Sequence, residues 1–191
     1  YNKFKDNFNQ KGLNLTKNID IDKWYAIVNA VRPSLIRIEA DELTYALHIM
    51  IRYEIEKGLF NGDMKVEDLP QIWNDKYEEY LGVRPSTNAE GVLQDVHWSG
   101  GSFGYFPSYA LGFLYAAQLK AAMLKDIPNF DELCATGELE SVKNWLTDKV
   151  HRHGAMKKPL EILQEATGEG LNASYLVAYL EEKYTRIYQL D

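Results

Sequence analysis

Cysteine and long apolar runs are scarce in this sequence. Its single cysteine, Cys134, cannot form a disulfide within the chain, and no stretch approaches the roughly 20 apolar residues that a membrane-spanning helix needs. The composition therefore argues against a disulfide-built fold and against a membrane partner. Because it suits a reducing compartment, we expect a cytoplasmic protein.

Positive charge is also in short supply. The 21 Lys and Arg residues are outnumbered by 28 Asp and Glu residues, which leaves a formal net charge of −7. Neutralising the phosphates of DNA or RNA requires a basic surface, and this balance does not provide one. We therefore expect no nucleic-acid partner.

An initiator methionine and a complete metal-binding motif are missing as well. The chain begins Tyr1-Asn-Lys-Phe4, which suggests a piece of a longer protein. His-Glu-x-x-His and zinc-spaced cysteine pairs do not occur. His151 and His153 are two residues apart, which on a helix turns them about 200° from one another, so a basic helix end is favoured over a metal pair.

Helical patterns dominate what is present. The strongest runs from Ile36 to Phe60, without glycine or proline until Gly58, and turn residues follow it. No alternating β-branched run competes, so we predict an all-α fold in a single domain over residues 1–191. Further helices are expected at Asp22 to Val31, Val66 to Leu81, Asn88 to Trp98 (short), Ser108 to Lys125, Asp131 to Ala135, Glu138 to Val150, Pro159 to Ala166 and Asn172 to Tyr188.

A polar stripe marks the longest predicted helix. At about 100° per residue its members fall within an arc of roughly 80°. One interpretation is a solvent-facing stripe with ordinary i,i+4 pairs, and the other is an anion clamp in which Asp41 orients Arg37. The members are Arg37, Asp41, Tyr45, His48 and Arg52.

A glycine-rich aromatic segment is the second candidate. It follows Gly91-Val-Leu-Gln-Asp-Val-His-Trp98 and reads Ser99-Gly-Gly-Ser-Phe-Gly-Tyr-Phe-Pro-Ser-Tyr109. Glycines let a backbone approach a ligand closely, and histidine or tyrosine can donate to a developing oxyanion. A tight turn packed by aromatic rings explains the same pattern, so both interpretations stay open.

These two segments resemble motifs of the thermostable carboxypeptidase (carboxypeptidase Taq) family. Ile36-Arg-Ile-Glu-Ala-Asp-Glu42 resembles its Ile/Val-Arg-x-x-Ala-Asp-Glu motif, and Gly91-Val-Leu-Gln-Asp-Val-His-Trp98 resembles Gly-x-x-Gln-Asp-x-His-Trp. Both agree at every defined position, and the likeness continues through Gly104-Tyr-Phe-Pro-Ser-Tyr109 and His151-Arg-His-Gly154. The resemblance covers nearly the whole chain.

The resemblance implies a role for each site residue. Arg37 would bind the free carboxylate of a peptide substrate. The catalytic residues His97 and Tyr105 would face the scissile carbonyl or the terminal residue, with Tyr109 competing for the tyrosine role. The substrate side would also include Asp41, Gln94, Asp95, Trp98 and Tyr109.

The resemblance also implies a cofactor and a fold. Zinc, or another divalent metal such as cobalt, would be held by a His-Glu-x-x-His helix and a glutamate upstream of the matched part. The fold would be the carboxy-terminal portion of a two-lobed, long-cleft, zincin-like metallopeptidase. Family members are commonly homodimers that act on peptides, and this chain alone would be inactive and bind no metal.

Two other functions fit parts of the pattern. A non-catalytic helical interaction module would use the aromatic segment for packing and the stripe as a salt-bridged surface. A carboxylate-bridged metal protein would use Asp41, Glu42 and His48, but the carboxylate–histidine pattern is not duplicated as a two-metal bundle requires.

Overall fold

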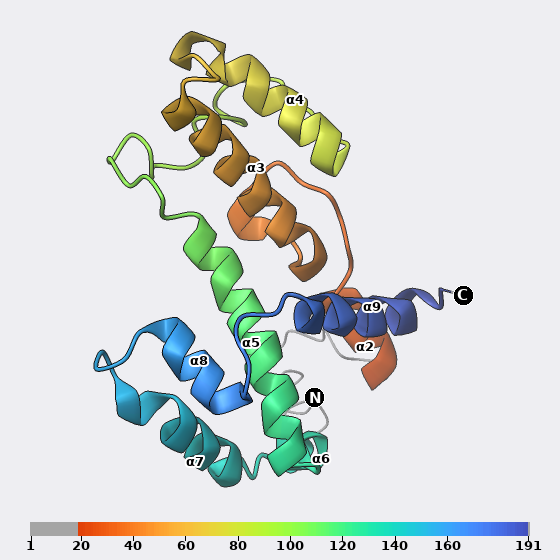
Figure 1. Cartoon of the computed structure of the whole chain (residues 1–191). Helices are drawn as coiled ribbons and strands as arrows, with labels where there is room; N and C mark the ends of the chain where they lie inside the picture. Colours follow the sequence, from red (N-terminus) through yellow and green to blue (C-terminus); the bar gives the residue numbers. More distant parts are fainter. Residues whose placement is uncertain (1–18, 191) are drawn as a thin grey trace. The chain divides into compact units, whose positions relative to one another are not determined.

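The structure, a computed structural model, describes residues 19–190, and every regular element in that range is helical (Figure 1). The prediction of an all-α fold is confirmed. The chain forms two compact units, which meet in sequence between Phe106 and Pro107. The prediction of one domain over residues 1–191 stays a prediction, because compactness does not by itself define a folding unit.

The first described helix, α2, spans Ile21–Val28. Asp20 caps it, since its carboxylate accepts a hydrogen bond from the Lys23 amide at 2.7 Å. The helix ends at Val28 and not at Val31, because the Asn29 side chain donates to the Tyr25 carbonyl at 2.8 Å and takes over the last turn.

The prediction of one helix from Ile36 to Phe60 is wrong at its start. Arg37–Glu39 form a short 3-10 helix, the chain is extended at Ala40, and α3 begins afresh at Glu42–Asn61. Asp41 caps α3 by accepting from the Thr44 amide at 2.9 Å. An aspartate at this position favours a new helix start over continuation, which periodicity alone does not reveal.

Helix α4, Leu69–Leu81, packs on α3 and completes the core of the first unit. It follows a 3-10 turn at Val66–Asp68. Gly62 and Gly82 end α3 and α4 in left-handed conformations, with φ of 80° and 66°. The core between these helices is formed by Ile51, Ile55, Trp73, Tyr77 and Leu81.

Residues 83–106 contain turns and no regular helix. The predicted short helix from Asn88 to Trp98 is wrong, because the chain closes isolated turns there. The Leu93 amide donates to the Asn88 carbonyl, and the Gln94 amide donates to the Gly91 carbonyl, both at 3.0 Å. The conformational freedom of Gly91 favours such turns over helix propagation.

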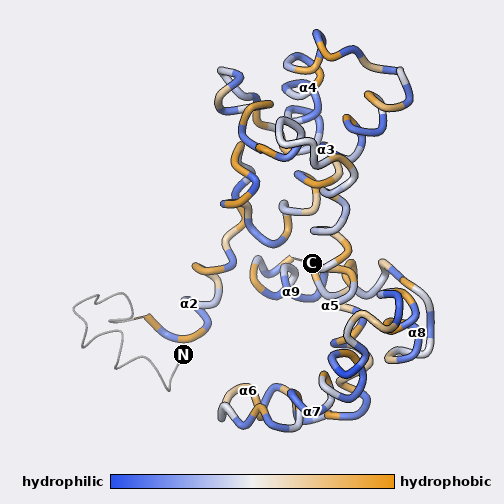
Figure 2. Tube along the Cα trace, turned by 90° about the vertical axis from the view of Figure 1, so that its left-hand side faces the viewer, coloured by the Kyte–Doolittle hydropathy of each residue, from blue (hydrophilic) through white to orange (hydrophobic). Residues whose placement is uncertain are grey.

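The second unit is built around α5, Pro107–Asp126, which contacts both α8 and α9. Hydrophilic and hydrophobic residues are mixed along α8 and α9, as expected for amphipathic helices (Figure 2). His151–His153 form a separate 3-10 turn after α7 and not the end of that helix. The remaining helices are α6 (Phe130–Thr136), α7 (Glu140–Lys149), α8 (Pro159–Thr167) and α9 (Ser174–Tyr188).

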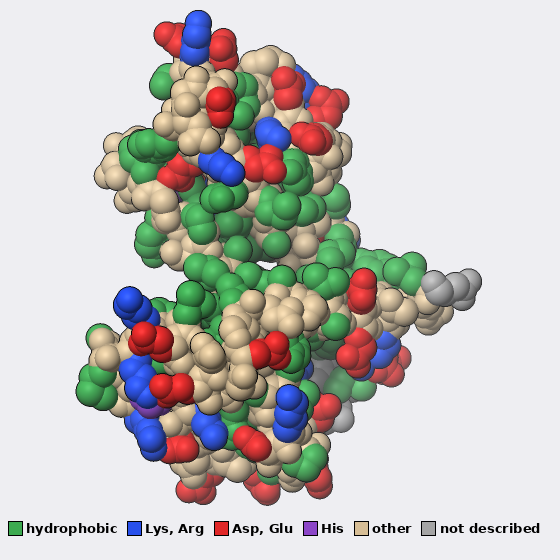
Figure 3. Space-filling model, viewed as in Figure 1, with side chains coloured by type: hydrophobic (Ala, Val, Ile, Leu, Met, Phe, Trp, Pro, Cys, Tyr) green, Lys and Arg blue, Asp and Glu red, His purple; other side chains and the backbone are tan. Residues whose placement is uncertain are grey.

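On the face of each unit that Figure 3 shows, acidic and basic side chains are interspersed. Among the described residues, no helix has the length and apolar character that crossing a membrane requires.

Candidate active site

The two motifs singled out in the sequence meet at one carboxylate in the first unit. Asp95 Oδ1 lies 2.7 Å from Arg37 Nη2, and Asp95 Oδ2 lies 2.6 Å from Arg52 Nε. Arg37 comes from the 3-10 turn before α3, Arg52 from the middle of α3, and Asp95 from the turn segment 83–106. We call Arg37, Asp95 and Arg52 the charge cluster.

Asp95, and not Asp41, orients Arg37. Nε of Arg37 also donates to Asp95 at 3.2 Å, and its Nη1 donates to the Tyr45 hydroxyl at 3.0 Å. The Asp41 carboxylate instead accepts from the Thr44 hydroxyl and from the Arg32 amide, each at 2.9 Å. The predicted Arg37–Asp41 pairing is wrong because capping α3 engages both carboxylate oxygens of Asp41.

The charge cluster is buried and carries one excess positive charge. Arg52 is fully buried, with its guanidinium 4.6 Å from the centre of the Trp73 ring, and Arg37 is 7% exposed. Burial alone would raise the pKa of Asp95, but hydrogen bonds and charge from both arginines outweigh it and hold that pKa below its usual value. Two cations therefore share one firmly ionised carboxylate, which suits the cluster to a second anion.

His97 and Tyr105 lie together beside this cluster. His97 Nδ1 is 3.8 Å from Asp95 Oδ1, and the His97 ring centre is 5.7 Å from that of Tyr105. The imidazole also packs against the buried ring of Phe106, with 4.4 Å between the two ring centres. Tyr105 is 50% exposed. The candidate anion-binding arginine and the two candidate proton donors therefore lie close together in the first unit.

The other predicted substrate residues lie in different surroundings. Gln94 is exposed and its side-chain amide donates to the Ala89 carbonyl. The Trp98 ring packs edge-on against Trp73, and Tyr109 belongs to the first turn of α5 in the second unit. Their roles, like those of His97, Tyr105 and Arg37, stay predictions.

Glu56 was missed by sequence reasoning, although it is buried on α3 at 7% exposure. Its carboxylate accepts hydrogen bonds from Trp98 and Gly104 in the glycine-rich segment. A sequence signal did exist, since Glu56 follows Arg52 by four residues and continues the polar stripe along α3.

His48 is fully buried on α3, and among residues 19–190 it belongs to no group of three or more side chains that could hold a metal. Its Nδ1 lies 3.1 Å from the Tyr77 hydroxyl, and its Nε2 has no hydrogen-bond partner among the described residues. Burial, helped by the positive charges of Arg52 and Arg37, lowers the pKa of His48 to about 4. Nearby Asp41 and Asp95 oppose this shift without cancelling it. The imidazole is therefore neutral at pH 7.

Acidification should destabilise the chain through His48. Because the folded-state pKa of His48 is about 4 and its ordinary value is 6.5, the unfolded state takes up this proton first as the pH falls. The free energy of unfolding should drop by about 3 kcal/mol between pH 7 and 4 through this group. Urea unfolding of wild type and of His48→Gln across this pH range checks the expected drop. The other titrating groups are present in both proteins, so their contribution cancels in the difference. A wild-type minus variant difference that does not change with pH would contradict the assignment.

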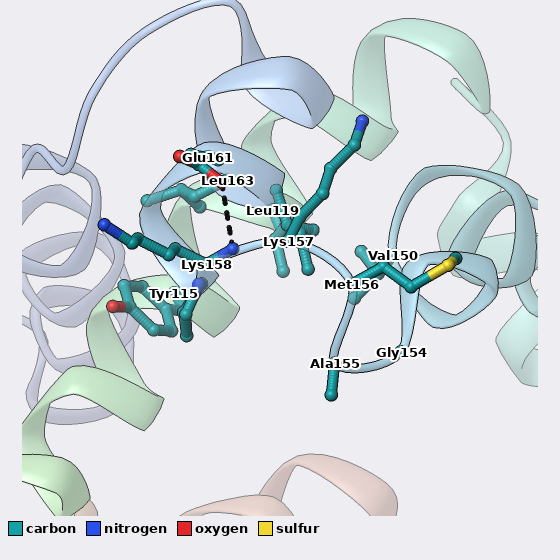
Figure 4. A pocket seen from close by; sticks show the side chains of 12 residues that line it. Tyr115, Leu119, Val150, Gly154, Ala155, Met156, Lys157, Lys158, Glu161 and Leu163 are labelled. Atoms are coloured by element: carbon teal, nitrogen blue, oxygen red, sulfur yellow. Dashed lines mark hydrogen bonds between the residues drawn. The ribbon is translucent and has the colours of Figure 1, made fainter.

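A cavity of about 670 Å³ lies in the second unit. Its lining is largely apolar, and Lys157 and Lys158 extend at its edge (Figure 4). The Lys158 amide donates to Glu161 at 3.0 Å, which completes the start of α8. None of the predicted site residues lines this cavity, so the candidate active site rests on the charge cluster and its neighbours.

Comparison with known proteins agrees with the motifs. Residues 1–184 match the family described as carboxypeptidase Taq (M32) metallopeptidase. Carboxypeptidase 1 of Bacillus subtilis is 60% identical over 174 residues, which are 91% of this chain and 35% of that protein. Thermostable carboxypeptidase 1 of Pyrococcus furiosus is 43% identical over 92% of this chain and 35% of its own length. The chain thus spans about a third of the length of these relatives.

Solved structures give the same result. The M32 carboxypeptidase from Deinococcus radiodurans is similar with a TM-score of 0.93 and 35% identity, covering 99% of this chain and 37% of that one. The family match and the similar structures together identify the class as a family of metallopeptidases. This chain belongs to the carboxypeptidase Taq (M32) family of metallopeptidases.

Proposed function

We propose that this chain is part of a zinc-dependent carboxypeptidase that releases C-terminal amino acids from peptides, and that it supplies the substrate side of the active site. The observation that supports this most is the convergence of both family motifs on Asp95, with Arg37, Arg52 and His97 around it. Family membership supports the same activity.

Arg37 is proposed to hold the free carboxylate of the substrate. A carboxypeptidase must distinguish a C-terminal carboxylate from an internal amide, and a guanidinium fork suits a carboxylate. Asp95 fixes the orientation of Arg37, while the excess positive charge of the charge cluster remains to balance the incoming anion. The low exposure of Arg37 reduces screening by water and strengthens such a contact.

His97 and Tyr105 are proposed to donate hydrogen bonds to the carbonyl oxygen that gains negative charge when water adds. Both groups can donate at neutral pH, and their rings lie within 5.7 Å of one another. Asp95 Oδ1 lies 3.8 Å from His97 Nδ1, so the imidazole is a close neighbour of the charge cluster. Tyr109 remains the competing phenol.

The family implies a divalent metal ion, which we propose to be zinc. A carboxypeptidase from Pyrococcus furiosus, 43% identical to this chain, has been solved in a form designated Apo-Mg, with a TM-score of 0.87 over 92% of this chain and 35% of that one. Residues 19–190 contain no group of three or more His, Cys, Asp or Glu side chains that could hold a metal. We propose that the ligands are a His-Glu-x-x-His helix and a glutamate upstream of the matched part, as the family resemblance implies. The same proposal includes a cytoplasmic homodimer and inactivity of this chain alone.

Mass spectrometry of peptide products tests the proposed activity. The intact protein should remove residues from the C-terminus of an unstructured decapeptide and produce a ladder of products that share the original N-terminus. A chelator should stop the ladder and added zinc should restore it, because hydrolysis without activated water is slow. Internal cleavage, N-terminal trimming or full activity in chelator would contradict the proposal. No cleavage at all would favour the helical interaction module.

A further inference from the structure

Glu56 joins helix α3 to the glycine-rich segment and to Trp98, the residue just before that segment. Its Oε2 accepts a hydrogen bond from the Trp98 indole nitrogen at 3.2 Å, and its Oε1 accepts one from the backbone amide of Gly104. The side chain is 7% exposed, so both bonds are partly shielded from water. One carboxylate therefore fixes two points of the chain that are six residues apart in sequence.

These two points are the neighbours of the two candidate catalytic residues. Trp98 directly follows His97, and Gly104 directly precedes Tyr105. Gly104 has a φ of 72°, a left-handed conformation that other residues rarely adopt, and its amide donates to Glu56 from that conformation. Fixing the indole of Trp98 and the amide of Gly104 therefore limits how far His97 and Tyr105 can separate.

The other hydrogen bonds of the segment are made to neighbouring residues more than to α3. The Gly100 amide donates to the Val96 carbonyl at 2.9 Å, and the Ser102 amide donates to the His97 carbonyl at 2.8 Å. The next turn of α3 adds one apolar contact, in which Phe60 lies edge-on to Phe103 at 5.1 Å between ring centres. Both of these rings are exposed, whereas the Glu56 carboxylate is shielded and accepts two hydrogen bonds, so Glu56 is the stronger attachment.

We propose that Glu56 is a positioning residue that holds His97 and Tyr105 at the separation at which both reach one carbonyl oxygen. The inference rests on the proposed function for the roles of those two residues. Catalytic donors must be held close to their productive geometry, and a displacement of about 1 Å can cost about 10²-fold in rate. The two hydrogen bonds of Glu56 go to Trp98 and Gly104, so its loss should act on the positions of His97 and Tyr105 more than on binding of the substrate carboxylate.

Glu56→Gln is the sharpest variant, because it preserves shape. A glutamine has one carbonyl oxygen, so it can accept from only one of the two donors and turns an N–H group toward the other. Glu54→Gln is the matched control on the same helix. Glu54 also accepts from two donors, Lys76 Nζ at 2.5 Å and the Tyr80 hydroxyl at 2.6 Å, but both belong to α4.

The test combines hydrogen exchange with steady-state kinetics on the intact enzyme. Glu56→Gln should speed amide exchange in residues 97–105 and lower kcat by about 10²-fold with KM nearly unchanged. Glu54→Gln should change neither the exchange rate in residues 97–105 nor kcat by more than about two-fold. If Glu56→Gln does not fold, Trp98→Phe removes just one of the two donors and should give the same changes at smaller size.

Three results would overturn the inference. The first is unchanged amide exchange in residues 97–105 of Glu56→Gln. The second is faster exchange in that variant together with a wild-type kcat. The third is a loss of kcat in Glu54→Gln equal to that in Glu56→Gln. The exchange measurement needs no catalytic activity, so it judges the attachment even if the proposed function fails. That failure would instead appear as wild-type kcat in Tyr105→Phe.

Discussion

Tyr105→Phe is expected to lower kcat of the intact enzyme by about 10²–10³-fold, on the order of 3–4 kcal/mol in transition-state stabilisation. The substitution deletes the hydroxyl and keeps the ring that packs near His97, whose centre lies 5.7 Å away. Because the phenol is proposed to donate to an oxygen that gains charge only during reaction, KM should change little. Steady-state kinetics on an N-blocked dipeptide provide the measurement.

Tyr109→Phe is the parallel variant for this result. Tyr109 lies in the first turn of α5 and is the competing phenol from the sequence motif. Metal content and helical circular dichroism should equal wild type in both variants, which separates loss of the hydroxyl from loss of structure. If both variants keep near-wild-type kcat, the aromatic segment is packing alone, and any oxyanion role belongs to His97 or to groups outside this chain.

Much of the helical fold could be predicted because its signals are local. Apolar periodicity and the glycines after α3 and α4 identify these helices, and Gly62 and Gly82 have the expected left-handed conformations. The break at Ala40 escaped prediction because Arg37 and Asp41 fit the same periodicity as the helix that follows. What decides the break is the Asp41 carboxylate, whose hydrogen bonds to the Thr44 amide favour a new helix start.

The site could be predicted in its members but not in its pairings. Arg37 and Asp95 were both named from motifs, yet they are 58 residues apart and nothing local links them. Periodicity instead suggested Asp41, the nearest carboxylate in sequence, as the partner of Arg37. Arg52 contacts Asp95 from 43 residues away and Glu56 contacts Gly104 from 48 residues away, and such contacts depend on how α3 packs.

Arg37→Met is the second substitution with a large expected effect. It should weaken substrate binding and change the stability of the fold little. The wild-type charge cluster has two cations for one carboxylate, so removing Arg37 leaves Asp95 paired with Arg52 at 2.6 Å. Charge balance in the buried region therefore survives, whereas breaking a buried one-to-one pair would leave an unpaired charge. The midpoint of thermal unfolding should stay close to wild type.

Arg37→Met should instead weaken binding of the substrate carboxylate. Removing one partner of a shielded, hydrogen-bonded charge pair typically costs about 2–5 kcal/mol, so KM should rise by about 10²-fold or more. The carboxylate is charged in the ground state and in the transition state, so kcat should change less than KM. Arg37→Lys keeps the charge but loses the planar fork, and it should fall between wild type and Arg37→Met.

The measurement that tests the proposed site most directly is the ratio of kcat/KM for a blocked dipeptide to that for its C-terminal amide, in wild type and in Arg37→Met. The two substrates differ only in the charged group that Arg37 is proposed to bind. We predict a strong preference for the free acid in wild type that falls by about 10²-fold in Arg37→Met. Equal discrimination by the two proteins would contradict the account and leave Arg37 as a structural partner of Asp95.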